Sequence, residues 1–168
     1  MTTRRNILLM AGAAAGALGL SRLFGGHAAA ASETFEVTRT DAEWKKLLTP
    51  DQYAVLRHEA TEPPHTSPLN NEKREGNFHC AGCDLPVYAS KDKYDSGTGW
   101  PSFTQSLPDA VRTKTDFQLI FPRTEVHCRR CGGHFGHVFD DGPQPTGKRH
   151  CINGLALTFR PAGGGGQG

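Results

Sequence analysis

The stretch that decides the fold is Cys128-Arg129-Arg130-Cys131-Gly132-Gly133-His134-Phe135-Gly136-His137-Val138-Phe139, in which a two-cysteine turn runs into a strand-like segment. A second such turn, Cys80-Ala81-Gly82-Cys83, precedes it by 44 intervening residues. Each C-x-x-C turn presents two thiolates, and a tetrahedral zinc ion takes four. The pattern predicts one structural zinc per chain, bound by Cys80, Cys83, Cys128 and Cys131.

Two disulfides among these four cysteines are the alternative, because the N-terminus predicts export to a compartment that permits them. Glycines within the first turn (Gly82) and directly after the second (Gly132-Gly133) supply the permissive backbone of a zinc knuckle and favour the metal. A closed four-sulfur site leaves no coordination position for water, so we expect it to be structural.

The N-terminus predicts a twin-arginine signal peptide over residues 1–31. Arg4 and Arg5 precede an apolar stretch from Ile7 to Leu20, and an alanine run at 28–31 has the spacing of a cleavage site. A membrane anchor is the alternative, but the stretch is shorter than the roughly 20 apolar residues that a spanning helix needs. We expect an exported protein, periplasmic or secreted.

The remaining 137 residues suit one domain, predicted over residues 32–161, with a disordered glycine-rich tail at 162–168. Removing three arginines and no acid with residues 1–31 changes the formal net charge from +2 to −1. A nearly neutral protein gives no electrostatic argument for nucleic acid or a membrane surface as partner.

The order of secondary structure predicts two short helices followed by an antiparallel β unit. Capping boxes at Thr40 to Glu43 and Thr49 to Gln52 mark the helix starts. Beyond Phe78 the sequence has short apolar or alternating runs separated by glycine, proline and aspartate, and we expect strands at 117–121, 124–127 and 155–159.

Cys151 is the thiol left over by the zinc set. If residues 149–153 form a strand, Arg149, Cys151 and Asn153 share one face while His150 points away. A cation beside the thiol favours the reactive thiolate, and Asn153 could donate a hydrogen bond. A buried, inert cysteine is the alternative.

Two histidines and a tryptophan are further candidates for the site around this thiol. His134 and His137 follow the second knuckle and could donate a proton near neutral pH, with metal ligation as the competing role. Trp100 lies in a loop between Gly99 and Pro101, where its indole could form an exposed apolar wall or pack in the core.

Three motifs together resemble the B-type peptide-methionine (R)-S-oxide reductases. They are the segments 94–103 (Tyr-Asp-Ser-Gly-x-Gly-Trp-Pro-Ser-Phe), 128–143 and 147–153, in that order, and the resemblance runs from about Trp44 to Phe159. It implies a mainly β fold of two antiparallel sheets (Mss4-like, or β-tent) with short N-terminal helices and a knuckle-bound zinc.

The resemblance also implies an enzyme that reduces the R epimer of methionine sulfoxide in oxidised proteins or peptides. Cys151 would be the nucleophile and become a sulfenic acid, which a thioredoxin-like or other external thiol reduces. The implied catalytic neighbours are His134, His137, Asn153 and Arg149, and Trp100, Phe103 and Phe139 would bind substrate, with Trp100 receiving the methyl group. We expect a monomer and no nucleic-acid partner.

Two positions depart from the family pattern. Thr98 stands where many relatives carry a resolving cysteine, and His150 stands where an aromatic residue is usual. Two other function classes are alternatives. A zinc-stabilised binding module would not need the Arg149-x-Cys151-x-Asn153 segment, and a cysteine hydrolase using Cys151 and His137 would need an oxyanion hole, for which the sequence gives no separate evidence.

Overall fold

A computed structural model describes residues 33–163, so the predicted signal peptide and the last five residues lie outside the described part. Two short helices open it, α1 (Asp41–Leu47) and α2 (Pro50–His58). Both begin with the predicted capping boxes, in which the side chains of Thr40 and Thr49 accept from the backbone N–H three residues later. Within residues 33–163, no helix has the length and apolar character needed to cross a bilayer.

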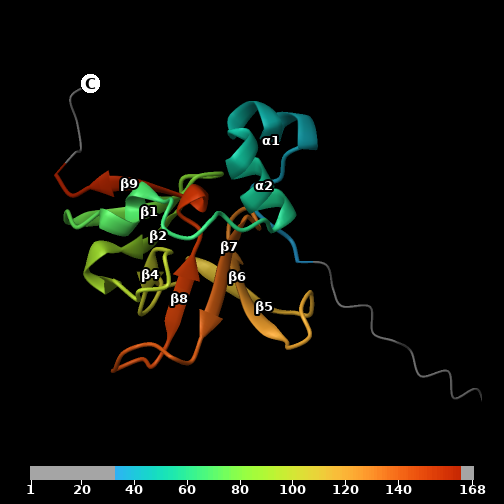
Figure 1. Ribbon diagram of the computed structural model, residues 1–168. Coiled ribbons are helices and arrows are strands. Elements are labelled where there is room, and N and C mark those ends of the chain that lie inside the picture. Colours follow the sequence, from blue (N-terminus) through green and yellow to red (C-terminus); the bar gives the residue numbers. More distant parts are fainter. Residues whose placement is uncertain (1–32, 164–168) are drawn as a thin grey trace, which may run out of the picture. The chain divides into compact units, whose positions relative to one another are not determined.

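The strands form two antiparallel sheets, which confirms the predicted fold class. The smaller sheet has the order β2 (Pro86–Ala89), β1 (Gly76–Cys80) and β9 (Leu157–Pro161). The larger sheet has the order β3 (Lys93–Tyr94), β4 (Ser102–Phe103), β8 (Arg149–Ile152), β7 (His134–Phe139), β6 (Arg123–Cys128) and β5 (Val111–Asp116). Figure 1 shows β8 and β7 side by side within the larger sheet.

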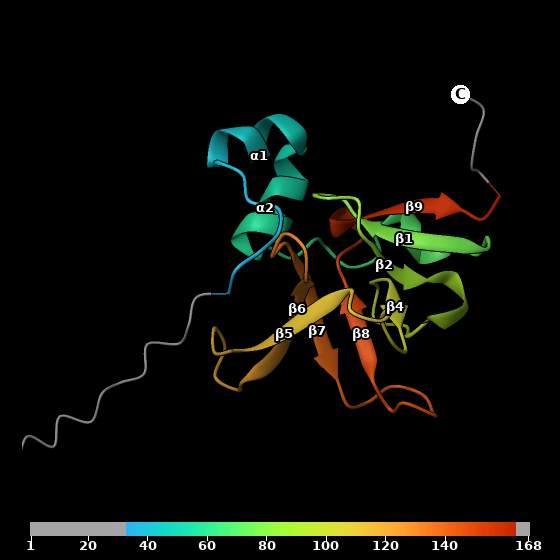
Figure 2. The same cartoon turned by 180° about the vertical axis from the view of Figure 1, so that it is seen from behind.

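Short 3-10 helices carry the chain between the sheets and along the loops. They are η1 (Pro68–Asn71), η2 (Ser90–Asp92) and η3 (Gly154–Ala156). The chain passes from the smaller to the larger sheet through η2 and returns through η3, directly after β8. The second crossing places the end of β8 where both sheets and α2 meet (Figure 2).

One predicted strand is wrong and one is shifted. Residues 117–121 form the loop between β5 and β6, because the Asp116 carboxylate accepts the Gln118 N–H at 2.7 Å and turns the chain, and Pro122 has no N–H for a ladder. The strand expected at 155–159 begins at Leu157, since the two residues before it belong to η3. The strand expected at 124–127 is confirmed by β6.

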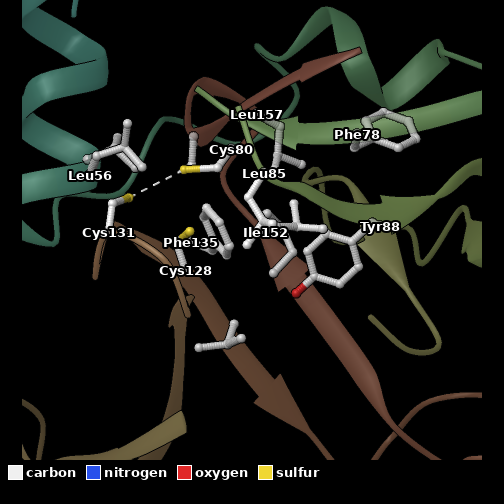
Figure 3. Close-up of a cluster of buried hydrophobic side chains, with 14 of the residues drawn as sticks. Leu56, Phe78, Cys80, Leu85, Tyr88, Cys128, Cys131, Phe135, Ile152 and Leu157 are labelled. Atoms are coloured by element: carbon white, nitrogen blue, oxygen red, sulfur yellow. Dashed lines mark hydrogen bonds between the residues drawn. The ribbon is translucent and has the colours of Figure 1, made fainter. Parts of the chain in front are cut away.

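Aromatic side chains from both sheets fill the core. The Phe103 ring stacks on Tyr88 with centroids 4.4 Å apart, and Phe78 meets Phe103 edge-on at 5.0 Å. Figure 3 shows Tyr88 beside Ile152, and Leu56 of α2 next to Cys131. Burying each such side chain stabilises the fold by roughly 1.5–3 kcal/mol, which fixes the faces that β4 and β8 present.

Candidate active site

Cys151 lies on β8 in the interior of the larger sheet. Its direct cross-strand partners are Ser102 on β4 and His137 on β7, so these three side chains project from the same face. The half-buried thiol opens on a pocket of about 180 Å³, whose lining residues are Thr61, Trp100, Arg123, Gly136, His137, Phe139, Cys151 and Asn153. His150 projects from the opposite face, where its ring contacts Tyr88, as the alternation predicted.

The electrostatic environment of Cys151 differs from the predicted one. Burial raises the pKa of the thiol, and the Thr98 hydroxyl and the Arg149 guanidinium lower it by less than burial raises it. Arg149 is shared with other groups, since it makes two 2.8 Å hydrogen bonds to Asp141 and stacks 4.5 Å from the Phe139 ring. Arg149 therefore lowers the pKa of Cys151 as expected, but the thiol stays protonated and needs a base to become the reactive thiolate.

His137, the cross-strand neighbour of Cys151, is the candidate for that base. Its Nε2 lies 2.8 Å from the Asp116 carboxylate, which also binds Arg123 at 2.6 Å. The pKa of Asp116 lies well below its usual range because it accepts hydrogen bonds from the Gln118 N–H, His137 and Arg123. An ionised Asp116 can only accept, so His137 carries its proton on Nε2 and keeps Nδ1 as a proton acceptor. Burial lowers the pKa of His137 and favours this neutral form.

His134 is buried and bonded elsewhere. Its Nδ1 lies 2.8 Å from Glu125 Oε1, and His127 Nδ1 lies 2.9 Å from Glu125 Oε2. His134 is 3% exposed and is not among the residues lining the Cys151 pocket, although its ring centroid is 5.5 Å from that of His137. The structure thus places His137, but not His134, in the wall of the Cys151 pocket.

A bulge explains how two histidines three residues apart reach the same face. In a regular strand such residues would point to opposite faces. Here β6 advances one residue, Val126 to His127, while β7 advances two, Gly136 to His134. Only glycine fits at position 136, because a Cβ there would lie 2.1 Å from the carbonyl oxygen of Cys151 and its φ is +153°.

Trp100 and Asn153 are held in place through one buried residue, Glu62. The Trp100 indole N–H donates to the Glu62 carbonyl at 3.0 Å, and the Glu62 N–H donates to Asn153 Oδ1 at 3.0 Å. The Glu62 carboxylate accepts the N–H groups of Gly154 and Leu155, at the start of η3. Asn153 also donates to the Phe135 carbonyl at 3.0 Å, so its amide ties the pocket walls together.

The predicted aromatic residues separate into two groups. Trp100 and Phe139 line the pocket beside Cys151. The prediction that Phe103 binds substrate is corrected, since Phe103 pairs with His150, faces the core and is fully buried. The strand alternation that directs Ser102 toward Cys151 necessarily directs Phe103 away from it.

The four knuckle cysteines converge at the end of β1 and β6, away from this pocket. All four Sγ atoms lie within 4.8 Å of one another, with Cys80 to Cys131 at 3.7 Å and Cys83 to Cys128 at 3.5 Å. Four sulfurs at about 2.3 Å from a tetrahedral zinc are about 3.8 Å apart, so this donor set fits that metal. The four cysteines are not disulfide-bonded. They could therefore bind one metal ion.

Comparison with known families agrees with this arrangement. Residues 48–161 match the model of the SelR domain. The chain belongs to the SelR domain family. The matched segment includes both knuckles, Cys151 and the whole pocket.

The curated proteins to which this chain is similar are named as peptide methionine sulfoxide reductases. The chain is 50% identical over 127 residues to "Peptide methionine sulfoxide reductase B1, chloroplastic" of Oryza sativa subsp. japonica, covering 75% of this chain and 59% of that protein. It is 47% identical over 127 residues to "Peptide methionine sulfoxide reductase MsrB" of Agrobacterium fabrum, covering 94% of that protein. For the protein of that name from Pseudomonas putida, identity is 48% over 130 residues and coverage 98%.

Several site residues of this SelR domain were missed by reasoning from the sequence. They are Thr61, Glu62, Asp116, Arg123 and Glu125. Glu125 carried the strongest signal, because a carboxylate within the strand-like run 124–127 must find partners when it is buried. Thr61 and Glu62 lie in a proline-rich connection with no local pattern, and only the tertiary structure brings them to Cys151.

Proposed function

We propose that this protein reduces the R epimer of peptide-bound methionine sulfoxide to methionine and thereby repairs oxidised proteins. One observation carries the proposal: Cys151, a free thiol outside the knuckle cluster, lines a small pocket together with a histidine and two aromatic side chains. Sulfoxide reduction needs a nucleophilic sulfur, a proton for the oxygen and an apolar contact for the methyl group. His137, Trp100 and Phe139 provide the last two.

The reaction transfers the sulfoxide oxygen to Cys151. Nδ1 of His137 takes the thiol proton as the sulfur attacks the electrophilic sulfur of the substrate, and this proton passes to the sulfoxide oxygen. The substrate S–O bond breaks, two electrons move to the substrate sulfur, and methionine leaves with Cys151 as a sulfenic acid. Since the pKa of the thiol is raised and that of His137 is lowered, thiol and neutral imidazole are the resting forms.

Recycling uses thiols from outside the chain. The remaining four cysteines are clustered at the knuckles. The side chain beside Cys151 Sγ, at 3.8 Å, is the hydroxyl of Thr98, which is not a thiol. A first external thiol displaces water from the sulfenic acid to form a mixed disulfide, and a second releases the Cys151 thiol. A thioredoxin-like dithiol can supply both.

One structural zinc ion per chain completes the proposal. The four-sulfur set would hold it, and when bound it would join β1, at Cys80, to β6, at Cys128. We further propose that residues 1–31 direct export by the twin-arginine route, that the protein works in the periplasm or outside the cell, and that it acts as a monomer. Cell fractionation and size-exclusion chromatography of the mature protein test these points.

The decisive experiment separates the epimers. Wild-type protein with dithiothreitol should consume N-acetyl-methionine (R)-sulfoxide and leave the S epimer, while Cys151→Ser should be inactive because a hydroxyl is a far weaker nucleophile near neutral pH. Trp100→Ala should lower kcat/KM by about 10- to 100-fold, the range expected for losing an apolar pocket wall. Retained activity in Cys151→Ser, or equal consumption of both epimers by the wild type, would contradict the proposal.

A further inference from the structure

The loop between β5 and β6 exposes an apolar patch, here called the 117–121 patch. The exposed fractions are 74% for Phe117, 59% for Leu119, 94% for Ile120 and 79% for Phe121. Large apolar side chains gathered in this way on a soluble surface mark an interaction site. In Figures 1 and 2 the loop lies on the side of the larger sheet away from the smaller one.

The base of this loop is part of the active-site wall. Its two ends, Asp116 and Arg123, are paired in register and joined by a 2.6 Å salt bridge. Asp116 also binds the catalytic base His137, and Arg123 lines the pocket. The Gln118 side chain donates to Glu59, two residues before the pocket residue Thr61. The base of the loop that carries the 117–121 patch therefore borders the Cys151 pocket.

The chemistry of the patch favours an uncharged, apolar polypeptide as its occupant. The segment from Phe117 to Pro122 has no charged residue, and the neighbouring cations Lys114 and Arg123 are paired with Glu59 and Asp116. An interfacial membrane site draws strength from cations facing anionic lipids, and these two are already engaged. Methionine belongs to apolar, usually buried sequence, so its oxidised form becomes accessible together with apolar neighbours when a protein is damaged.

We propose that the 117–121 patch binds apolar side chains flanking the oxidised methionine in an unfolded or extended polypeptide. The inference rests on the proposed function and names its substrate class. The pocket holds the sulfoxide, and the patch holds the apolar side chains next to it in the sequence.

The test compares kcat/KM for three substrates, with dithiothreitol as reductant. They are N-acetyl-methionine (R)-sulfoxide amide, a pentapeptide with the sulfoxide between Leu and Phe residues, and a pentapeptide with it between Ser and Gly residues. The wild type should prefer the apolar peptide over the polar one by about tenfold, as expected from partial burial of one or two side chains. The double variant Ile120→Ser, Phe121→Ser should bring this ratio close to one.

The matched control is Leu47→Ser, which removes another exposed apolar residue, 52% accessible, from α1 and should keep the tenfold ratio. A wild-type ratio near one, or an unchanged ratio in the double variant, overturns the inference. So does loop-dependent sedimentation with phosphatidylcholine and phosphatidylglycerol vesicles in the absence of a peptide preference, which would assign the patch to a membrane. Failure of the wild type to reduce the acetylated amino acid would instead overturn the proposed function itself.

Discussion

Replacing Glu125 by Gln tests the buried network behind the active site. The Glu125 carboxylate is 2% exposed and is flanked by two buried histidines, His127 and His134. Burial acts to raise its pKa, but the hydrogen bonds with these histidines outweigh burial and lower it to about 2 from an ordinary 4.5. At 1.36 kcal/mol per pKa unit, ionised Glu125 contributes roughly 3 kcal/mol of stability at pH 7.

Glu125→Gln keeps the shape and removes the charge, so it should lower the free energy of unfolding by about 3 kcal/mol at pH 7. Because the folded-state pKa is depressed, this contribution is complete above pH 4.5 and is lost as the pH falls toward 2. The difference between wild type and variant should therefore shrink to roughly half by pH 3. Urea titrations at fixed zinc concentration measure it, and the exposed Glu75→Gln should stay within about 0.5 kcal/mol of the wild type. A pH-independent difference, or none at pH 7, would refute the reasoning.

Three other outcomes are expected. The mature protein should contain about one zinc per chain by metal analysis, and Cys83→Ser should lose the metal and about 3 kcal/mol or more of stability; two disulfides in place of metal would contradict this. Single-turnover rates should be level between pH 6.5 and 9.0. The rate should fall at lower pH, where His137, with its lowered pKa, becomes protonated, and at higher pH, where Cys151, with its raised pKa, ionises. A fall in rate inside this pH window would contradict His137 as base. One equivalent of sulfoxide should leave the wild type with a dimedone-reactive Cys151 and with zinc retained, whereas Thr98→Cys should instead form an internal disulfide. Peptide mapping distinguishes these products. A bond from Cys151 to a knuckle cysteine in the wild type would show that the knuckle cysteines resolve the sulfenic acid.

Features that depend on neighbouring residues were predictable from the sequence. Both capping boxes lie within four residues and formed as expected. The two knuckles are tight turns whose glycines indicate their backbone, and their four sulfurs do converge. Alternation along β8 correctly separated Cys151 from His150. In each of these cases the physical constraint acts over one turn or one strand, so the pattern contains it.

Features that depend on strand register were not predictable. Phe103 belongs to the same motif as Trp100, yet its direction is set by the pairing of Ser102 with Cys151, two segments nearly 50 residues apart. Because of the bulge at Gly136, His134 lies on the same face as His137, whereas regular alternation would place the two on opposite faces. The carboxylates of Asp116 and Glu125 act on those histidines from β5 and β6. None of these relations leaves a local sequence signal strong enough to assign.

Recycling depends on one side chain rather than on the fold. Thr98 Oγ1 lies 3.8 Å from Cys151 Sγ, and its loop is fixed by Ser96, whose hydroxyl is within 2.8 Å of Thr98 and 2.7 Å of Ser102. Since Ser102 pairs directly with Cys151, the loop is tied to the same row of the sheet as the nucleophile. A thiol at position 98 would already lie beside the sulfenic acid, whereas a hydroxyl there cannot reduce it. On the proposed mechanism, the scaffold is therefore suited to internal resolution, and this chain, with threonine at position 98, would take its electrons from another molecule.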